Sequence, residues 1–150
     1  MTWFITISLI IMFIVLTVSL VRWNLSRGLQ RSLDLSEYQV FDQLRVSAAA
    51  KLKAGETLGI EMKCTVAMNS RELHLIPTRF NPFLFMTDFP FTFSKKANRK
   101  LKIQSSDWYK IIFTGKQRKS SVFGSELEVT IHIKNEKESK QLLKLLKSWK

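Results

Sequence analysis

Residues 3–21 read WFITISLIIMFIVLTVSLV, nineteen residues without a charged side chain. Each residue of a helix adds ~1.5 Å, so this apolar run is roughly 28 Å long, about the thickness of a bilayer's hydrocarbon core. Trp3 and Trp23 flank it, as aromatic residues do at membrane interfaces. The apolar run therefore predicts a transmembrane anchor over residues 1–22. The side chains expected to face lipid are Trp3, Phe4, Ile5, Ile7, Leu9, Ile10, Ile11, Phe13, Ile14, Val15, Leu16, Val18, Leu20 and Val21.

Two other interpretations of the apolar run are a cleaved signal peptide and a helix buried in a soluble core. Signal peptides carry a basic n-region, a shorter apolar core and a small-residue cleavage site. Here only the terminal amine precedes the run as a positive charge, and residues 19–23, SLVRW, contain no A-x-A pattern. The remaining chain is also too small to enclose so apolar a helix. We therefore favour a retained membrane helix.

Positive charge follows the apolar run at once. Arg22, Arg27 and Arg31 all precede the first acidic residue, Asp34. Short flanks rich in Arg or Lys remain in the cytosol. We therefore expect a single-pass protein of the cell membrane, with its N-terminus outside and its domain in the cytosol.

The 150-residue chain has a formal net charge of +12, all of it after the apolar run. A basic surface favours an anionic neighbour, which could be phospholipid headgroups, an acidic protein or nucleic acid. For a tethered domain, the inner leaflet is the nearest such neighbour, although a basic surface can also serve solubility alone. Cys64 is the only cysteine, so no intrachain disulfide can form, as suits a reducing cytosol.

Residues 23–54 are interpreted as a basic juxtamembrane stretch followed by a linker helix over residues 36–53. Apolar side chains recur there at steps of three and four residues, the spacing of one helix face. Gly55 would end this helix. The recurring side chains are Tyr38, Phe41, Leu44, Ala48 and Leu52.

Residues 55–150 are expected to form one β domain. Apolar and polar residues alternate most clearly over residues 58–66 and 126–134, as in half-buried antiparallel strands. Shorter strands are expected over 72–76, 101–104 and 108–114, with basic turns over 94–99 and 116–121. A final helix follows Asn135, a capping residue, and has an apolar face that includes Leu142, Leu146 and Trp149. The predicted fold class is α+β, mainly antiparallel β: a barrel or sandwich of six to seven strands capped by a C-terminal amphipathic helix.

This layout resembles the pleckstrin-homology-like (PH-like) superfold, including GRAM and bacterial PH-like domains. The likeness is carried by Gly55-Glu56-Thr57-Leu58 at the start of a strand, by the strand over 127–133, and by the helix over 136–149. The resemblance implies a module for membrane targeting or protein docking, and many such domains bind phosphoinositides through basic residues between early strands. The turn after the strand over 58–66 carries one arginine, Arg71, and so departs from that lipid-binding pattern.

No catalytic or metal-binding motif is recognisable in the sequence. His74 and His132 are the only histidines, and neither has a Cys or His at a ligand spacing. No G-x-S-x-G elbow and no glycine-rich phosphate loop occurs. We therefore expect a protein that is not an enzyme and uses neither a cofactor nor a metal.

The remaining candidate site is a set of basic residues in two predicted turns. Hairpin turns at one end of a barrel could bring both clusters together near an anionic leaflet, although basic turns also serve solvation and discourage strand-edge pairing. The candidate anion- or lipid-binding residues are Lys95, Lys96, Arg99, Lys100, Lys102, Lys116, Arg118 and Lys119.

Two functions of different classes fit these features. The first is a non-enzymatic, membrane-anchored module whose basic face binds anionic lipid or an acidic protein at the inner membrane face. The second is an accessory or scaffold subunit of a membrane complex, in which the apolar run engages other transmembrane helices. Nucleic-acid binding is disfavoured because the sequence contains no recognised DNA- or RNA-binding motif.

Overall fold

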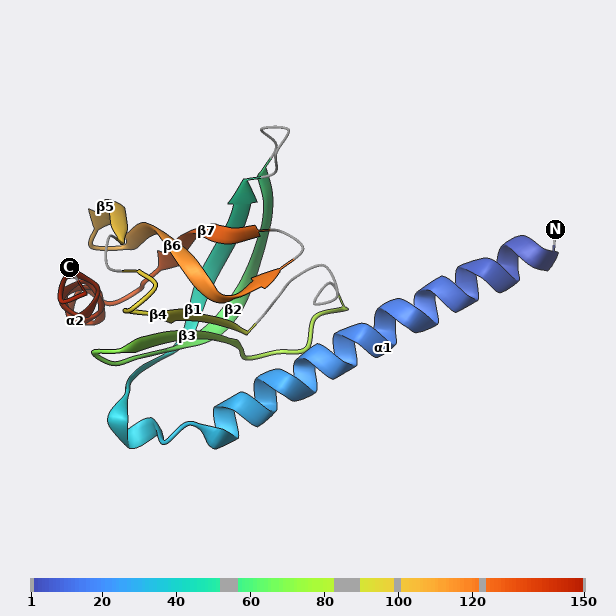
Figure 1. Ribbon diagram of the computed structural model, residues 1–150, viewed down its shortest axis with the longest axis horizontal. Coiled ribbons are helices and arrows are strands. Elements are labelled where there is room, and N and C mark those ends of the chain that lie inside the picture. Colours follow the sequence, from blue (N-terminus) through green and yellow to red (C-terminus); the bar gives the residue numbers. More distant parts are fainter. Residues whose placement is uncertain (1, 52–56, 83–89, 99–100, 122–123, 150) are drawn as a thin grey trace.

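The computed structural model describes residues 2–51, 57–82, 90–98, 101–121 and 124–149. A long N-terminal helix, α1 (Thr2–Ser32), lies beside an antiparallel β barrel and projects far beyond it (Figure 1). A second helix, α2 (Glu136–Lys147), covers the opposite side of the barrel. The predicted fold class, α+β with mainly antiparallel strands and a helix at each end of the chain, is confirmed.

The helix α1 is continuous through the apolar run and the basic stretch after it. It is long and apolar enough to cross a membrane, and most of its apolar side chains are exposed. A short 3-10 helix, η1 (Leu35–Glu37), follows, and the Asp34 carboxylate caps it by accepting from the Ser36 N–H at 3.0 Å. This turn redirects the chain into the sheet.

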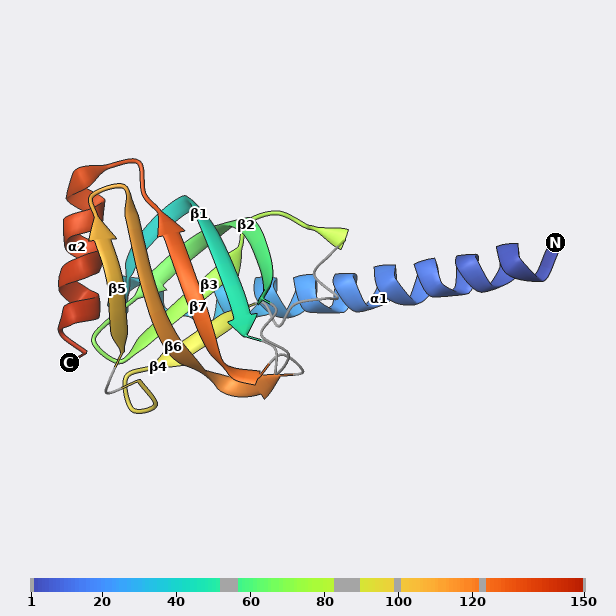
Figure 2. The ribbon, with the colours of Figure 1, turned by 90° about the horizontal axis from the view of Figure 1, so that it is seen from above.

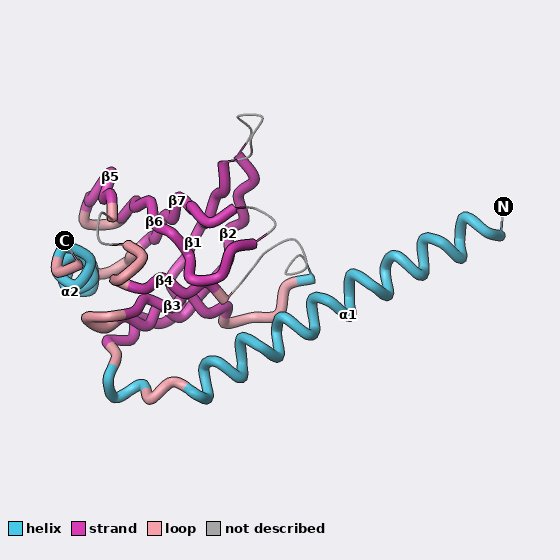
Figure 3. Tube along the Cα trace, in the orientation of Figure 1, coloured by secondary structure: helices cyan, strands magenta, loops and turns pink. Residues whose placement is uncertain are grey.

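Seven strands form one sheet in the order β4-β3-β2-β1-β7-β6-β5. A further pairing of Phe93 with Gln117 joins β4 to β6 and closes the sheet into a barrel (Figures 2 and 3). Closure of this kind leaves few unpaired strand edges. The strands are β1 (Gln39–Lys51), β2 (Thr57–Met68), β3 (Glu72–Pro77), β4 (Phe91–Ser94), β5 (Lys102–Asp107), β6 (Lys110–Ser121) and β7 (Gly124–His132).

The predicted linker helix over residues 36–53 is wrong, because most of this segment is the strand β1. A β-bulge explains the helical spacing. The register of β1 on β2 shifts between Phe41 and Leu44, and Gln43 takes a left-handed conformation with φ of 59°. The bulge lets Phe41 and Leu44 both face the core although they are three residues apart. The sheet therefore begins N-terminal of residue 55.

The predicted basic turn over 116–121 is also wrong, because these residues continue β6 to Ser121. Their pairing with β7 is regular as far as Lys116 opposite Glu126 and resumes at Ser121 opposite Gly124. The irregular stretch between these pairs lengthens the hairpin without ending the strand.

The C-terminal helix is held as its sequence predicts. The Asn135 side chain caps it by accepting from the Lys137 N–H at 2.9 Å. Leu142, Leu146 and Trp149 are almost fully buried in the core, and the Trp149 indole N–H donates to the Asn69 carbonyl at 3.3 Å. The helix thus closes one end of the barrel.

Truncation of Trp149 should strongly destabilise the fold. Replacing a buried Trp by Ala costs about 3–5 kcal/mol through lost burial and a cavity. We expect the Trp149→Ala chain to unfold at a clearly lower temperature than the natural chain, measured by circular dichroism in detergent micelles. Trp108→Ala is the matched control, because Trp108 is 58% exposed, and it should unfold close to the natural temperature. Equal losses in the two variants would contradict the capping role of α2.

Cys64 should make the fold less stable at alkaline pH. Burial raises the pKa of its thiol far above the usual 9.0, so the unfolded chain loses a proton that the folded chain keeps. The resulting stability is complete below the unfolded pKa and is lost as the pH rises above about 9, by ~1.4 kcal/mol per pH unit. Urea unfolding in micelles at pH 8 to 10.5 should show this extra slope in the natural chain and not in Cys64→Ala. Parallel profiles would refute it.

Candidate functional site

The antiparallel connectivity sorts the strand ends into two groups. The helix end comprises α2 and the turns 69–71 and 95–98, and it is joined by a hydrogen bond from the Lys95 ammonium to the Ser148 carbonyl at 2.7 Å. The chain leaves β1, β3 and β6 at the opposite end, which we call the loop end. In both views, the ends of β3 and β6 point to the side on which α1 projects, and α2 lies away from that side (Figures 1 and 2).

One stripe of α1 packs on the domain. Ser19 and Ser26 are fully buried, whereas Val15, Trp23 and Leu29 are partly buried, and these residues follow one another at steps of three and four. The stripe lies against β3, and Trp23 reaches the edge of the hydrophobic core. The domain therefore begins to cover α1 within the apolar run.

Two contacts tie the loop end to α1. The Ser19 hydroxyl donates to the Pro82 carbonyl at 2.5 Å. The Trp23 ring meets the Phe80 ring edge-on, with 6.4 Å between centroids, and Arg27 lies over the Trp23 ring at 5.7 Å. Such aromatic and cation–π contacts add to the burial of the rings. The segment after β3 is thus fixed where the apolar run gives way to arginines.

Sequence reasoning missed this role of Ser19. Hydroxyl residues in a membrane helix ordinarily bond the carbonyl four residues back. Thr17 does so with Phe13 at 2.8 Å, and Ser26 does so with Arg22 at 2.9 Å. Ser19 instead donates across 63 positions of sequence to Pro82. The only feature of the sequence that could have predicted this contact is spacing. Ser19 and Ser26 lie two helical turns apart and therefore on one face of the helix.

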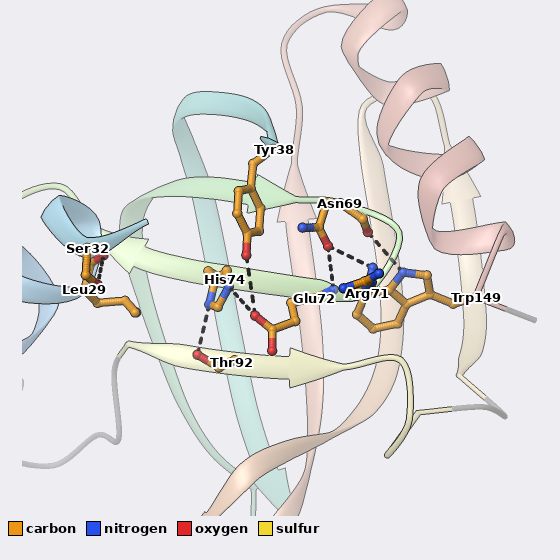
Figure 4. A network of polar contacts seen from close by, with 9 residues as sticks. All are labelled: Leu29, Ser32, Tyr38, Asn69, Arg71, Glu72, His74, Thr92 and Trp149. Atoms are coloured by element: carbon orange, nitrogen blue, oxygen red, sulfur yellow. Dashed lines mark hydrogen bonds and ion pairs between the residues drawn. The ribbon is translucent and has the colours of Figure 1, made fainter. Parts of the chain in front are cut away.

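A polar network ties the start of β1 to β3 and β4 (Figure 4). The buried His74 ring lies 3.1 Å from the Thr92 hydroxyl through Nδ1 and 3.2 Å from the Glu72 carboxylate through Nε2. The Tyr38 hydroxyl lies 3.5 Å from the same carboxylate. Burial, followed by the charge of Glu72, raises the pKa of Tyr38 above its usual 10.0, so its hydroxyl stays protonated. The network holds these elements together.

Two of the predicted basic residues, Lys95 and Lys96, lie at the helix end. Lys95 is half-buried and holds the end of α2, as described above, while Lys96 is exposed. Asn98 joins the turn 95–98 to β6 by two hydrogen bonds. Its side chain donates to the Lys116 carbonyl at 2.7 Å and accepts from the Lys116 N–H at 2.5 Å. Gly115 permits the approach, since a Cβ there would lie 3.1 Å from Asn98 Oδ1.

The other predicted basic residues extend along the barrel. Lys102 begins β5 opposite Thr114, and the exposed Lys116 faces Glu126 across the β6–β7 pair. Arg118 and Lys119 follow in β6, nearer the loop end. Arg99 and Lys100 lie outside the described residues. The candidates that the structure describes thus run from the helix end toward the loop end.

The residues predicted to set the topology all lie in the last third of α1. Arg22 is partly buried against the domain, whereas Arg27 and Arg31 are exposed. The predicted anchor side chains are exposed, except that Val15 is partly buried. Over the described ranges, no three His, Cys, Asp or Glu residues gather into a group that could hold a metal ion.

Comparison with known proteins adds little to this geometry. The sequence matches no protein-family model. No curated protein is similar to it. A chain in the crystal structure of the complex of PDZ-RhoGEF DH/PH domains with GTP-γ-S-activated RhoA is similar in structure, with a TM-score of 0.43 and 14% sequence identity. The match covers 79% of this chain and 31% of that chain.

Proposed function

We propose that this chain is a non-enzymatic, single-pass membrane protein that presents a basic PH-like module at the inner face of the cell membrane, with anionic lipid as the ligand of the loop end. The observation that carries the proposal is the contact of the loop end with α1, through Ser19 with Pro82 and Trp23 with Phe80. This contact orients the domain relative to the apolar run.

The orientation follows from the direction of α1. The exposed, apolar part of α1 projects beyond the loop end, while α2 lies on the opposite side of the barrel. If this part of α1 crosses a bilayer, the loop end is the part of the domain that faces the headgroups. The helix end then faces away from the membrane and leaves Lys96 open to an acidic protein partner.

Basic residues lie near the contact between α1 and the segment after β3. Arg22 and Arg27 lie in α1 beside the loop end, and Arg79 is exposed on the segment after β3. The positions of Arg118 and Lys119 lie in the part of β6 nearest this end. Each Lys or Arg close to an anionic leaflet contributes about 1 kcal/mol, and tethering raises the effective concentration further. These residues together would give a salt-dependent preference for anionic lipid.

Topology is the first test. We expect a reporter that is active only in the cytosol to work when fused after Lys150, because Arg22, Arg27 and Arg31 hold the C-terminal side of α1 inside. Protease added outside intact cells should leave the domain whole. Cleavage of the domain from outside would refute the proposed placement.

Lipid preference is the second test, made with the full chain in vesicles. Energy transfer from its tryptophans to pyrene-labelled phosphatidylglycerol should exceed transfer to pyrene-labelled phosphatidylcholine, and the difference should shrink as salt is added. The double variant Arg118→Gln/Lys119→Gln should reduce the difference. Its matched control, Lys96→Gln/Lys144→Gln, removes the same charge from the helix end and should leave the difference unchanged.

Equal transfer to both lipids at low salt would remove anionic lipid as the ligand. A protein recovered with the full chain after gentle detergent extraction would then favour the alternative function, an accessory subunit of a membrane complex. If the control variant loses as much of the preference for anionic lipid as the test variant, net charge produces that preference and the loop end does not.

A further inference from the structure

The contact with α1 sets how deep the segment 78–82 lies in a bilayer that α1 crosses. Ser19 precedes Arg22 by three residues, which is about 4.5 Å along the helix axis. Its partner, the Pro82 carbonyl, lies at the same level. The polar interface on each side of a bilayer is roughly 5–7 Å thick. A bilayer whose hydrocarbon core ends near Arg22 therefore has the Pro82 carbonyl just inside the core boundary. Phe80, which packs on Trp23, then lies at the start of the interface and not in bulk water.

The side chains of this segment suit that depth. Phe80 remains 40% exposed although it contacts Trp23, and its neighbour Arg79 is exposed. Aromatic rings favour the boundary between headgroups and acyl chains, and arginines favour the phosphates above it. The exposed aromatic side chain thus adjoins the apolar surface of α1 and a cation at the same level.

The segment is also held rigidly from two sides. The Thr78 N–H and hydroxyl both donate to the Lys63 carbonyl, each at 3.0 Å, which fixes the segment to β2. Ser19 fixes its other end to α1. Phe80 is therefore presented by a preorganised support and needs no ordering on contact with lipid.

We infer that the segment 78–82 is a second membrane contact, in which Phe80 inserts at the headgroup–acyl boundary of the bilayer that α1 crosses and Arg79 meets the headgroup phosphates. The inference rests on the proposed membrane placement. The occupant is lipid, because the exposed ring is continuous with the apolar surface of α1. The contact requires no anionic lipid, since Phe80 supplies apolar burial and phosphates occur in zwitterionic lipids as well.

The test places a spin label at position 80. The variant Phe80→Cys of the full chain is labelled, reconstituted in phosphatidylcholine vesicles, and measured for collision with oxygen and with a polar nickel complex. We expect the oxygen-to-nickel ratio at position 80 to be several-fold higher than at Ser70→Cys, an exposed turn position at the helix end. The natural chain is the blank, because Cys64 is fully buried and its thiol stays protonated.

A second label at Arg79→Cys provides an independent reading, expected between those at positions 80 and 70. A label at Ile10→Cys, within the apolar run, separates the possible failures. If Ile10 is in lipid and position 80 is as accessible to nickel as position 70, the inference is overturned and the membrane placement stands. If position 80 is accessible to neither reagent, a protein covers it and the inference is overturned. If Ile10 itself is aqueous, the membrane placement fails as well.

Discussion

The seating of α1 on the outer face of β3 is the constraint on which the rest of the structure depends. Ser19 is buried within an uncharged, mostly apolar stretch, and a buried hydroxyl without a partner costs about 1–3 kcal/mol. The Pro82 carbonyl satisfies it, and Trp23 packs nearby against Phe80. A helix joined only by a flexible linker would leave the domain free to rotate. The contact at Ser19 instead gives the barrel one orientation relative to the apolar run.

The seating also explains why β3 is buried on both faces. Leu73 and Leu75 point into the barrel core, while His74 and Ile76, on the opposite face of the strand, are buried too. An outer face of a small barrel is ordinarily solvated, so a buried His there needs polar partners. Thr92 and Glu72 provide them, and the Tyr38 ring lies against the imidazole with 5.5 Å between centroids. The chain between α1 and β1 thus forms part of the domain surface.

The sequence predicted the elements whose pattern is regular and missed those that depend on a local irregularity or a distant contact. Alternation over 58–66 and 126–134 located β2 and β7, the strand expected over 72–76 located β3, and the Asn135 cap located α2. The strand β1 was missed because its bulge at residues 42–43 imitates helical spacing. For the candidate site, the sequence predicted which basic residues take part but not where they lie in the fold. Which basic residues lie at which end depends on strand pairing, and the partner of Ser19 depends on tertiary packing.

If α1 crosses a bilayer as proposed, the orientation of the domain decides which charges can act on that bilayer. The strand β3 joins the turn 69–71 at the helix end to the segment that carries Arg79. It is 6 residues long, which is about 20 Å at ~3.3 Å per residue, or more than two Debye lengths of ~8 Å. In the proposed placement, lysines at the helix end, such as Lys96 and Lys144, would therefore feel less of the surface potential than Arg79. A net charge of +12 is then a poor measure of membrane affinity in this chain. Under the proposed placement, the fraction that counts is the part that α1 and its contact with Pro82 would hold at headgroup level.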